Sequence, residues 1–335
     1  MSALAPHAGQ HMATEIAQIP AVFVAALEQK LELPDLEGLR AIYTVARGSS
    51  DAAANILSYE FMRETGLPMT SLPPSIFSVG RGVALDGSAV LVVSQSGASQ
   101  DLVASARGAA QAGARVLALV NAEGSAVEAA ADATLRICAG PELAVPATKS
   151  VVGSIAGGMA LLGHLRPHYA AQAQASAIGF AALQGASLPQ AAALQAALLR
   201  ARHVYVIGRD TGFGAAQELA LKLKECCALH AEAYSSSEVL HGPLQLATNP
   251  LLIIILYTEQ EAVQDSLNTA QTRFSAAGGT VFRLRPSDVG ARGLTPAAAA
   301  AALLCLTYPL ALHCALALGL NPDQPATLSK VTQTK

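Results

Sequence analysis

Residues 220–244 bring together lysines, glutamates and histidines, the kinds of side chain needed for proton transfer, in a chain where charged residues make up only 13% of the sequence. Enzymes most often use carboxylates, histidines and lysines as general acids and bases. A helix would place Lys222 and Glu225 on one face, where the ammonium would favour the ionised carboxylate. His241 precedes Gly-Pro, which predicts a turn. The alternative interpretation of the segment is an amphipathic helix with solvated charges. Its lysines, glutamates and histidines are Lys222, Lys224, Glu225, His230, Glu232, Glu238 and His241.

These residue types fit the transfer of a proton between two adjacent carbons of a substrate. One carboxylate can remove a weakly acidic C–H proton from one carbon and return it to the next, and Glu225 has the required type. His241 could serve as a second acid or base, because histidine is the side chain that most often takes this role. The alternative for His241 is an ordinary hydrogen-bonding role in its loop. We expect His230 to be structural.

Two turns rich in hydroxyl groups follow predicted strands in the first half of the chain and run directly into helices. Backbone N–H groups and the dipole at a helix N-terminus favour an anion, so these turns predict a phosphate site. The sequence has neither GxxxxGK[ST] nor GxGxxG, which favours a sugar phosphate over a nucleotide. The alternative is ordinary capping of each helix by serine. The turn residues are Gly48, Ser49, Ser50, Ser94, Gln95, Ser96, Gly97, Ala98 and Ser99.

The chain repeats one arrangement of strands and helices. Residues 41–46 form an apolar run that enters the turn RGSSD and then a helical pattern, and residues 203–207 enter GRDTGFG in the same way. Further along, residues 90–93 and 251–256 each lead through a polar turn and a helix to a similar strand, AGARVLALV and AGGTVFRL. Uniformly apolar strands that alternate with helices predict a parallel sheet covered on both faces.

We therefore predict an α/β fold with two tandem, doubly wound parallel-sheet domains of the flavodoxin-like, three-layer αβα type. Ligands of such sheets bind beyond the carboxyl ends of the strands, where the polar turns lie. The predicted segments are an N-terminal tail with a lead-in helix (1–36), a first, phosphate-binding domain (37–165), a helical connector (166–197), a second domain with the catalytic helix and loop (198–320) and a C-terminal tail (321–335).

Composition narrows the function classes. The net charge is −3, Trp is absent and no run is dense in Lys or Arg, which argues against binding of nucleic acid. Five cysteines without CxxC spacing predict a reducing, cytoplasmic location and no metal site. The N-terminus shows no charged-then-apolar leader.

Two apolar segments predict buried helices. Residues 295–320 carry no formal charge and are long enough to span a bilayer, but their alanine content, Pro309 and His313 favour two buried segments, or one helix kinked at the proline, at the centre of a dimer. Residues 151–165 contain small residues that allow close helix packing. We expect no membrane association.

Several motifs together resemble the SIS (sugar isomerase) family, and most closely the isomerase half of glucosamine-6-phosphate synthases. They are the SQSG turn, AGPELAVPATKS at residues 139–150, LKLKE with HAEAYSSSEVLHGPL, and DQPATLSK near the C-terminus. The resemblance covers about residues 12–335. It implies two tandem SIS domains, a homodimer and no cofactor, without the glutaminase half of the synthases.

The resemblance also implies roles for individual residues. Glu225 matches the base that moves the proton between C1 and C2, and His241 matches the ring-opening residue, which the neighbouring subunit contributes. Lys330 matches a Schiff-base lysine in the C-terminal tail, which we expect to close over the sugar. Lys222 matches a charged residue near the substrate, and Val145 lines the sugar through its backbone. The residues that surround the phosphate are Gly48, Ser49, Ser50, Ser94, Gln95, Ser96 and Ser99.

This chain departs from the synthases at several positions. Arg47 replaces a cysteine, Ala98 a glutamate and Ser237 a glycine in the loop before His241. Ala147 replaces a serine that contacts the sugar, which points to a different substrate or reaction direction.

Without a glutaminase half, we expect a glucosamine-6-phosphate deaminase that forms fructose 6-phosphate and ammonia from a hexosamine 6-phosphate. The alternatives within enzymes are a fructosamine-6-phosphate deglycase and a ketose/aldose isomerase of phosphosugars. The alternative from another class is a non-catalytic sensor of sugar phosphates. The presence of Glu225, His241 and Lys330 argues against the sensor.

Overall fold

The computed structural model describes residues 7–330, which divide into two compact units. The predicted terminal segments include residues 1–6 and 331–335, which lie outside the described residues. The domain boundaries expected from the sequence stay a prediction. We name each unit after its sheet: the five-stranded unit comprises residues 21–142 and 149–174, and the four-stranded unit comprises residues 7–20, 143–148 and 175–330.

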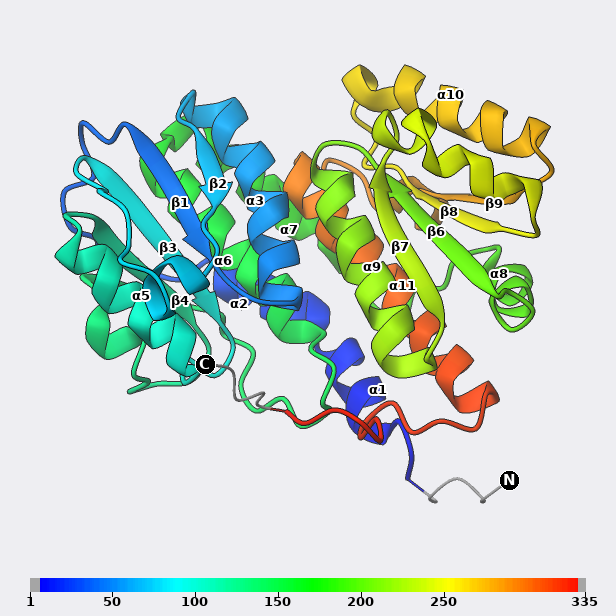
Figure 1. Ribbon diagram of the computed structural model, residues 1–335, viewed down its shortest axis with the longest axis horizontal. Helices are drawn as coiled ribbons and strands as arrows, with labels where there is room; N and C mark the ends of the chain where they lie inside the picture. Colours follow the sequence, from blue (N-terminus) through cyan, green and yellow to red (C-terminus); the bar gives the residue numbers. More distant parts are fainter. Residues whose placement is uncertain (1–6, 331–335) are drawn as a thin grey trace. The chain divides into compact units, whose positions relative to one another are not determined.

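Parallel strands form the central sheet of the five-stranded unit. They are β1 (Ala41–Val45), β2 (Met69–Ser71), β3 (Ser88–Ser94), β4 (Arg115–Val120) and β5 (Ala133–Arg136). Their order is β2-β1-β3-β4-β5, which is the flavodoxin-like order. Every residue of the central strand β3 is buried, and helices lie on both faces of the sheet (Figure 1). This burial explains why β3 is almost wholly apolar in sequence.

Helices cover this sheet and place its polar turns. On one face, Leu102 and Ala106 pack with Val90 and Val92 of β3 in one apolar core. The helices in the first half of the chain are α1 (Gln10–Ala17), α2 (Ile19–Leu27), α3 (Ser49–Thr65), α4 (Ser75–Ser78), α5 (Gln100–Gln111), the short 3-10 helix η1 (Glu128–Ala130), α6 (Lys149–Leu165) and α7 (Pro167–Ala181). Helices α3 and α6 pack against each other, and almost all of α6 is buried, as the small residues of 151–165 predicted.

The four-stranded unit repeats this design with one strand fewer. Its strands are β6 (His203–Gly208), β7 (His230–Ser235), β8 (Leu252–Leu256) and β9 (Thr280–Leu284), in the parallel order β7-β6-β8-β9. Its remaining helices are α8 (Ala191–Leu198), α9 (Thr211–Cys227), η2 (Glu238–His241), η3 (Pro243–Thr248), α10 (Glu261–Ala276), η4 (Pro286–Val289) and α11 (Pro296–Ala317). Helix α9 packs against β6, β7 and α11.

The apolar segment near the C-terminus forms the single helix α11. Thr295 caps it by accepting a hydrogen bond from the Ala298 N–H at 3.3 Å, and the helix continues through Pro309. Of the two forms expected from the sequence, the structure therefore has one helix rather than two. By length and composition α11 could cross a membrane, but 83% of its most apolar window is buried. That burial is typical of a core helix.

The predicted α/β class with two parallel, helix-covered sheets is confirmed. The sequence did not reveal β2, β5 or β7 as separate strands. Residues 220–244 are not one helix, because α9 ends at Cys227 and Ala228 takes a left-handed conformation, with φ +52°. The chain then forms the strand β7, so the interpretation of the whole segment as one amphipathic surface helix is wrong.

Close contact between α3 and α6 makes Gly158 sensitive to substitution. A Cβ atom at Gly158 would lie 2.3 Å from Cδ1 of Leu57, which is fully buried, so the packed core around it would have to shift. We expect Gly158→Ala to lower the free energy of unfolding by about 1–3 kcal/mol. Denaturant unfolding measures this, with Gly163→Ala on the same helix as control, since its nearest atoms are 3.3 Å away. Equal stability of the two variants would contradict this packing.

Candidate active site

Glu225 lies in the last turns of α9, where neighbouring polar groups hold its carboxylate. The Lys222 ammonium bonds to Glu225 Oε2 and lies 3.5 Å from Glu218 Oε1. The Lys222 and Glu218 side chains are fully buried, whereas that of Glu225 is 24% exposed. Tyr308 of α11 donates to Glu218 Oε1 at 3.1 Å. A chain of polar groups thus leads from the interior to a carboxylate that is open to solvent.

Helical spacing explains this alignment. Glu218, Lys222 and Glu225 are separated by four and three residues, which places them on one face of α9. The prediction that Lys222 and Glu225 share a helix face is confirmed. The substrate-binding role of Lys222 stays a prediction. The ammonium points at the carboxylates of Glu218 and Glu225.

The negative charges of two neighbouring carboxylates keep the buried Lys222 side chain ionised. Burial by itself lowers the pKa of Lys222, but the carboxylates of Glu218 and Glu225 outweigh it and hold that pKa above its ordinary value. The ammonium is therefore positive at any pH at which an enzyme works. One fixed positive charge beside Glu225 gives this carboxylate a defined orientation, which a general base needs.

Cys226, the next residue along α9, offers no competing nucleophile. Burial raises the pKa of its thiol to about 12, so it stays protonated near neutral pH.

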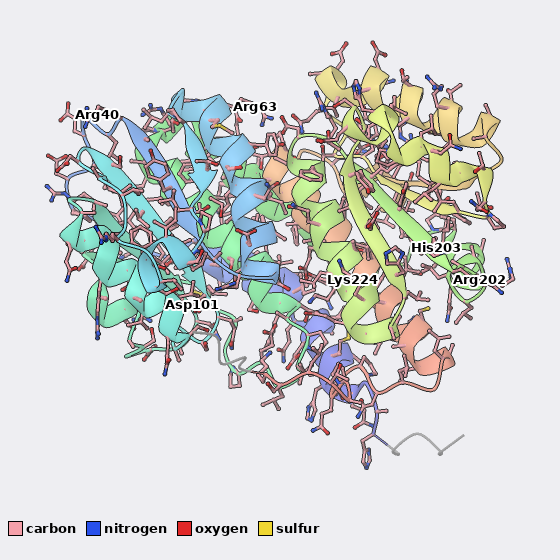
Figure 2. The ribbon with its side chains drawn as sticks, viewed as in Figure 1. Arg40, Arg63, Asp101, Arg202, His203 and Lys224 are labelled. Carbon is pink, nitrogen blue, oxygen red and sulfur yellow. The ribbon has the colours of Figure 1, made fainter. Side chains whose placement is uncertain are left out.

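The two histidines near Glu225 in sequence lie on different elements. His241 ends η2 and is exposed, next to Gly242. His230 begins β7, and its Nδ1 lies 3.1 Å from Nδ1 of His203, the first residue of β6, which Figure 2 labels. The two rings form an edge-to-face pair. This contact supports the structural role expected for His230, and the catalytic role of His241 stays a prediction.

The C-terminal tail carries Lys330 to a loop of the same unit. Lys330 Nζ donates to the Ala144 carbonyl at 2.6 Å, and the Val145 N–H donates to the Asp323 carbonyl at 2.9 Å. The Asp323 carboxylate in turn accepts hydrogen bonds from the backbone N–H groups of His11 and Met12. The structure thus brings together Lys330 and Val145, 185 positions apart, which the resemblance assigned to one sugar site.

The two polar turns of the five-stranded unit lie where strands meet helices. Gly48 precedes α3 with φ +53° and ψ −125°, a conformation that favours glycine. Ser94 ends β3, and its Oγ accepts a hydrogen bond from the Gly97 N–H at 3.0 Å. A Cβ atom at Gly97 would lie 2.2 Å from Ser125 Oγ, so the turn requires glycine there.

The hydroxyl groups of Ser94 and Ser96 accept hydrogen bonds from backbone N–H groups of their own turn. Ser99 precedes α5 with an extended backbone, yet its hydroxyl group makes no cap hydrogen bond within the described residues, and Gly48 before α3 has no side chain to make one. Ser49 and Ser50 are already the first residues of α3. Two helix N-termini that follow adjacent parallel strands form an arrangement that suits a phosphate. The roles of the seven predicted phosphate residues stay predictions.

An ion pair joins the two turns. Arg47 precedes Gly48, and its Nε and Nη2 lie 2.7 and 2.5 Å from Asp101 Oδ2, in the first turn of α5. The Asp101 side chain is fully buried, whereas that of Arg47 is 50% exposed. Figure 2 labels Asp101 beside the five-stranded sheet. Because two bonds share one carboxylate, the pair fixes the distance between the two helix N-termini.

Sequence reasoning missed three residues that support these sites. Glu218 had a signal, since it lies four residues before Lys222 on a predicted helix. Tyr308 and Asp101 had none, because only tertiary packing brings them to Glu218 and Arg47. Within residues 7–330, no group of three or more His, Cys, Asp or Glu side chains could hold a metal ion.

Removal of the buried Lys222 ammonium tests its ion pairs with Glu218 and Glu225. We expect Lys222→Met to lower the free energy of unfolding by about 3–5 kcal/mol near neutral pH, because two carboxylates lose their buried partner. The pKa of Lys222 is raised in the folded state, so its contribution is complete below the unfolded pKa of 10.5 and is lost as pH rises through the higher folded value.

Denaturant unfolding at pH 7 measures the first effect, and the second begins to appear only above pH 10.5. Lys224→Met is the control, since Lys224 lies on the same helix and is exposed (Figure 2). A Lys222→Met protein as stable as the Lys224→Met protein at pH 7 would refute the buried ion pairs.

Comparisons with known proteins match this chain to one family. Residues 35–163 and 197–282 match the family model of the SIS domain. A glutamine–fructose-6-phosphate aminotransferase (isomerizing) of Symbiobacterium thermophilum is 32% identical over 336 residues, which cover 92% of this chain and 54% of that protein. The chain thus spans about half the length of the curated relatives it matches.

Solved structures agree. A crystal structure from Silicibacter pomeroyi DSS-3, provisionally described as a phosphosugar isomerase, is 31% identical with a TM-score of 0.80 and covers 93% of this chain and 99% of its own. A glucosamine-6-phosphate deaminase of Thermotoga maritima, with a TM-score of 0.75, covers 97% of this chain and 100% of its own, but at 18% identity it shows the fold alone. The family model and the relatives establish that this chain belongs to the SIS family.

Proposed function

We propose that this chain is an enzyme that isomerises aminosugar phosphates, and specifically a glucosamine-6-phosphate deaminase. The observation that carries the proposal is the carboxylate of Glu225, partly exposed and oriented by the buried Lys222 ammonium. The hydroxyl-rich turns of the five-stranded unit supply the phosphate-binding groups. Relatives named as isomerizing aminotransferases support chemistry on a hexose 6-phosphate.

The reaction begins with ring opening. His241 accepts the proton of the C1 hydroxyl and returns it to the ring oxygen as the bond between C1 and that oxygen breaks. Following the family resemblance, we propose that the chain forms a homodimer and that His241 of one protomer acts in the active site of the other. We also propose that the enzyme is cytoplasmic. Its exposure on η2 is consistent with this role.

Proton transfer follows. Glu225 removes the proton from C2 of the open-chain sugar while the C1 oxygen takes up a proton from solvent, which leaves an enaminol. Glu225 then returns its proton to C1 as the nitrogen releases one to solvent. The product is an imine at C2, and water hydrolyses it to a ketone and ammonia, which gives fructose 6-phosphate. These steps use only acid–base groups. Lys330, near Val145, is placed by the resemblance at the sugar's carbonyl carbon.

Substrate profiling separates the alternatives within enzymes. Ammonia from glucosamine 6-phosphate supports deamination, whereas turnover of only fructosamine 6-phosphates supports deglycation. Interconversion of phosphosugars without release of nitrogen supports a simple isomerase. Absence of ammonia at millimolar glucosamine 6-phosphate would refute the first proposal.

Glu225→Gln separates the enzyme from a sensor of sugar phosphates. The amide keeps the size of the side chain but cannot accept the C2 proton, so we expect ammonia release to fall by roughly 10²–10⁴-fold. We expect the variant still to bind glucosamine 6-phosphate in calorimetry. Glu232→Gln is the matched control, because Glu232 lies nearby in sequence and its side chain is 41% exposed. Undiminished turnover in Glu225→Gln would remove this carboxylate from the mechanism.

The Arg47–Asp101 pair gives a separate test of the phosphate-binding turns. Asp101→Asn keeps the side-chain size but weakens the link between the two helix N-termini. We expect KM for glucosamine 6-phosphate and the inhibition constant of inorganic phosphate to rise about tenfold, with a smaller change in kcat. The exposed Asp86→Asn is the control. An unchanged inhibition constant for phosphate in Asp101→Asn would contradict a phosphate site at these turns.

A further inference from the structure

Arg209 connects the end of β6 to the segment that carries His241. Arg209 directly follows β6, and its Nη1 donates to Ser235 Oγ at 2.9 Å and also to Ser237 Oγ. Ser235 is the last residue of β7, and Ser237 directly precedes η2. One guanidinium group therefore bonds to both ends of the short turn between β7 and η2. We name residues 235–237 the serine turn.

Other contacts hold the serine turn at its middle residue. The Ser236 N–H donates to the Gly208 carbonyl at 2.9 Å, and the hydroxyl groups of Ser236 and Ser266 lie 2.6 Å apart. Arg209 thus acts together with the backbone of its preceding residue and with α10. The serine turn has one well-defined position relative to the end of β6.

The chain after the serine turn is fixed as well. Val239, within η2, is fully buried. Beyond His241, the Tyr205 hydroxyl donates to the Pro243 carbonyl at 3.3 Å. The segment is held before and after His241, yet His241 itself is exposed. This is the arrangement expected for a side chain that must be presented in one orientation.

The first repeat contains an arginine at the same place. Arg47 and Arg209 each stand directly before the residue that precedes the helix, Gly48 and Asp210, whose φ values are +53° and +57°. Arg47 donates to the buried carboxylate of Asp101, whereas Arg209 donates to two neutral hydroxyl groups. Ser237 supplies one of these hydroxyl groups, whereas the glucosamine-6-phosphate synthases that this chain resembles have a glycine at that position.

From these contacts we infer that Arg209 is a positioning residue, which holds the serine turn so that His241 is oriented for ring opening. The inference rests on the proposed function. It deepens that function by assigning a residue to the ring-opening step rather than to the C–H step. Arg209 touches no reacting atom in this proposal and acts through Ser235 and Ser237.

Two variants test this role. Arg209→Lys keeps the positive charge but loses the planar fork that reaches two hydroxyls, and Ser237→Gly removes one of its partners. We expect each to lower kcat/KM for glucosamine 6-phosphate by roughly tenfold, as a misplaced catalytic group does. The double variant should lose little more than Arg209→Lys alone, because both changes break the same contact. Arg202→Lys, an exposed arginine just before β6, is the control (Figure 2).

The deuterium isotope effect at C2 separates a positioning role from a general structural one. Ring opening precedes removal of the C2 proton, so a slower ring opening should bring the isotope effect on kcat/KM towards one in Arg209→Lys. A variant that loses activity with an unchanged isotope effect would overturn the inference, and so would a variant with undiminished activity.

Amide hydrogen exchange in residues 236–242 gives a readout that does not depend on activity. We expect exchange there to rise in Arg209→Lys and to stay unchanged in Arg202→Lys. If the unsubstituted protein released no ammonia from any aminosugar phosphate, the proposed function and the ring-opening role would both fail. The exchange measurement would still decide whether Arg209 holds the serine turn, and unchanged exchange would refute that as well.

Discussion

A buried ammonium group, that of Lys222, is the constraint on which the four-stranded unit depends. An ammonium in a protein interior is costly unless negative partners surround it. Glu218 and Glu225 meet this need from the same helix, and Tyr308 ties Glu218 to α11. Apolar side chains of similar size would often be as stable. The carboxylate at the outer end of this arrangement therefore points to function as the reason why the charges are kept.

The sequence predicted the fold wherever burial on both faces left a pattern. The wholly buried β3 and β8 are continuous apolar runs, and their repetition along the chain revealed two similar sheets. The edge strand β7, HAEAYS, has only one buried residue and carries polar residues, so it could be mistaken for part of a polar helix. The three-residue strand β2 was too short to leave a periodic signal.

In the candidate site, contacts between residues close in sequence could be predicted, whereas contacts between distant residues could not. Lys222 and Glu225 were paired correctly because helical spacing is a local property of the sequence. The Arg47–Asp101 ion pair joins residues 54 positions apart, and no local pattern encodes it. The contact of Lys330 with the loop at Ala144 likewise needs the folded chain. For that region, only the resemblance to a known family anticipated that the two segments belong to one site.

The two repeats also show how one backbone arrangement can serve two purposes. Gly48 and Asp210 stand at equivalent places with nearly the same backbone angles, φ +53° and ψ −125° against φ +57° and ψ −134°. Glycine adopts this conformation easily, whereas aspartate is strained by it. The Asp210 carboxylate accepts a hydrogen bond from the Thr211 N–H at the start of α9, where a helix favours an anion. The second repeat thus fills its anion position with its own side chain, while the first has glycine there. This difference supports the proposal of a phosphate site at the first repeat rather than at the second.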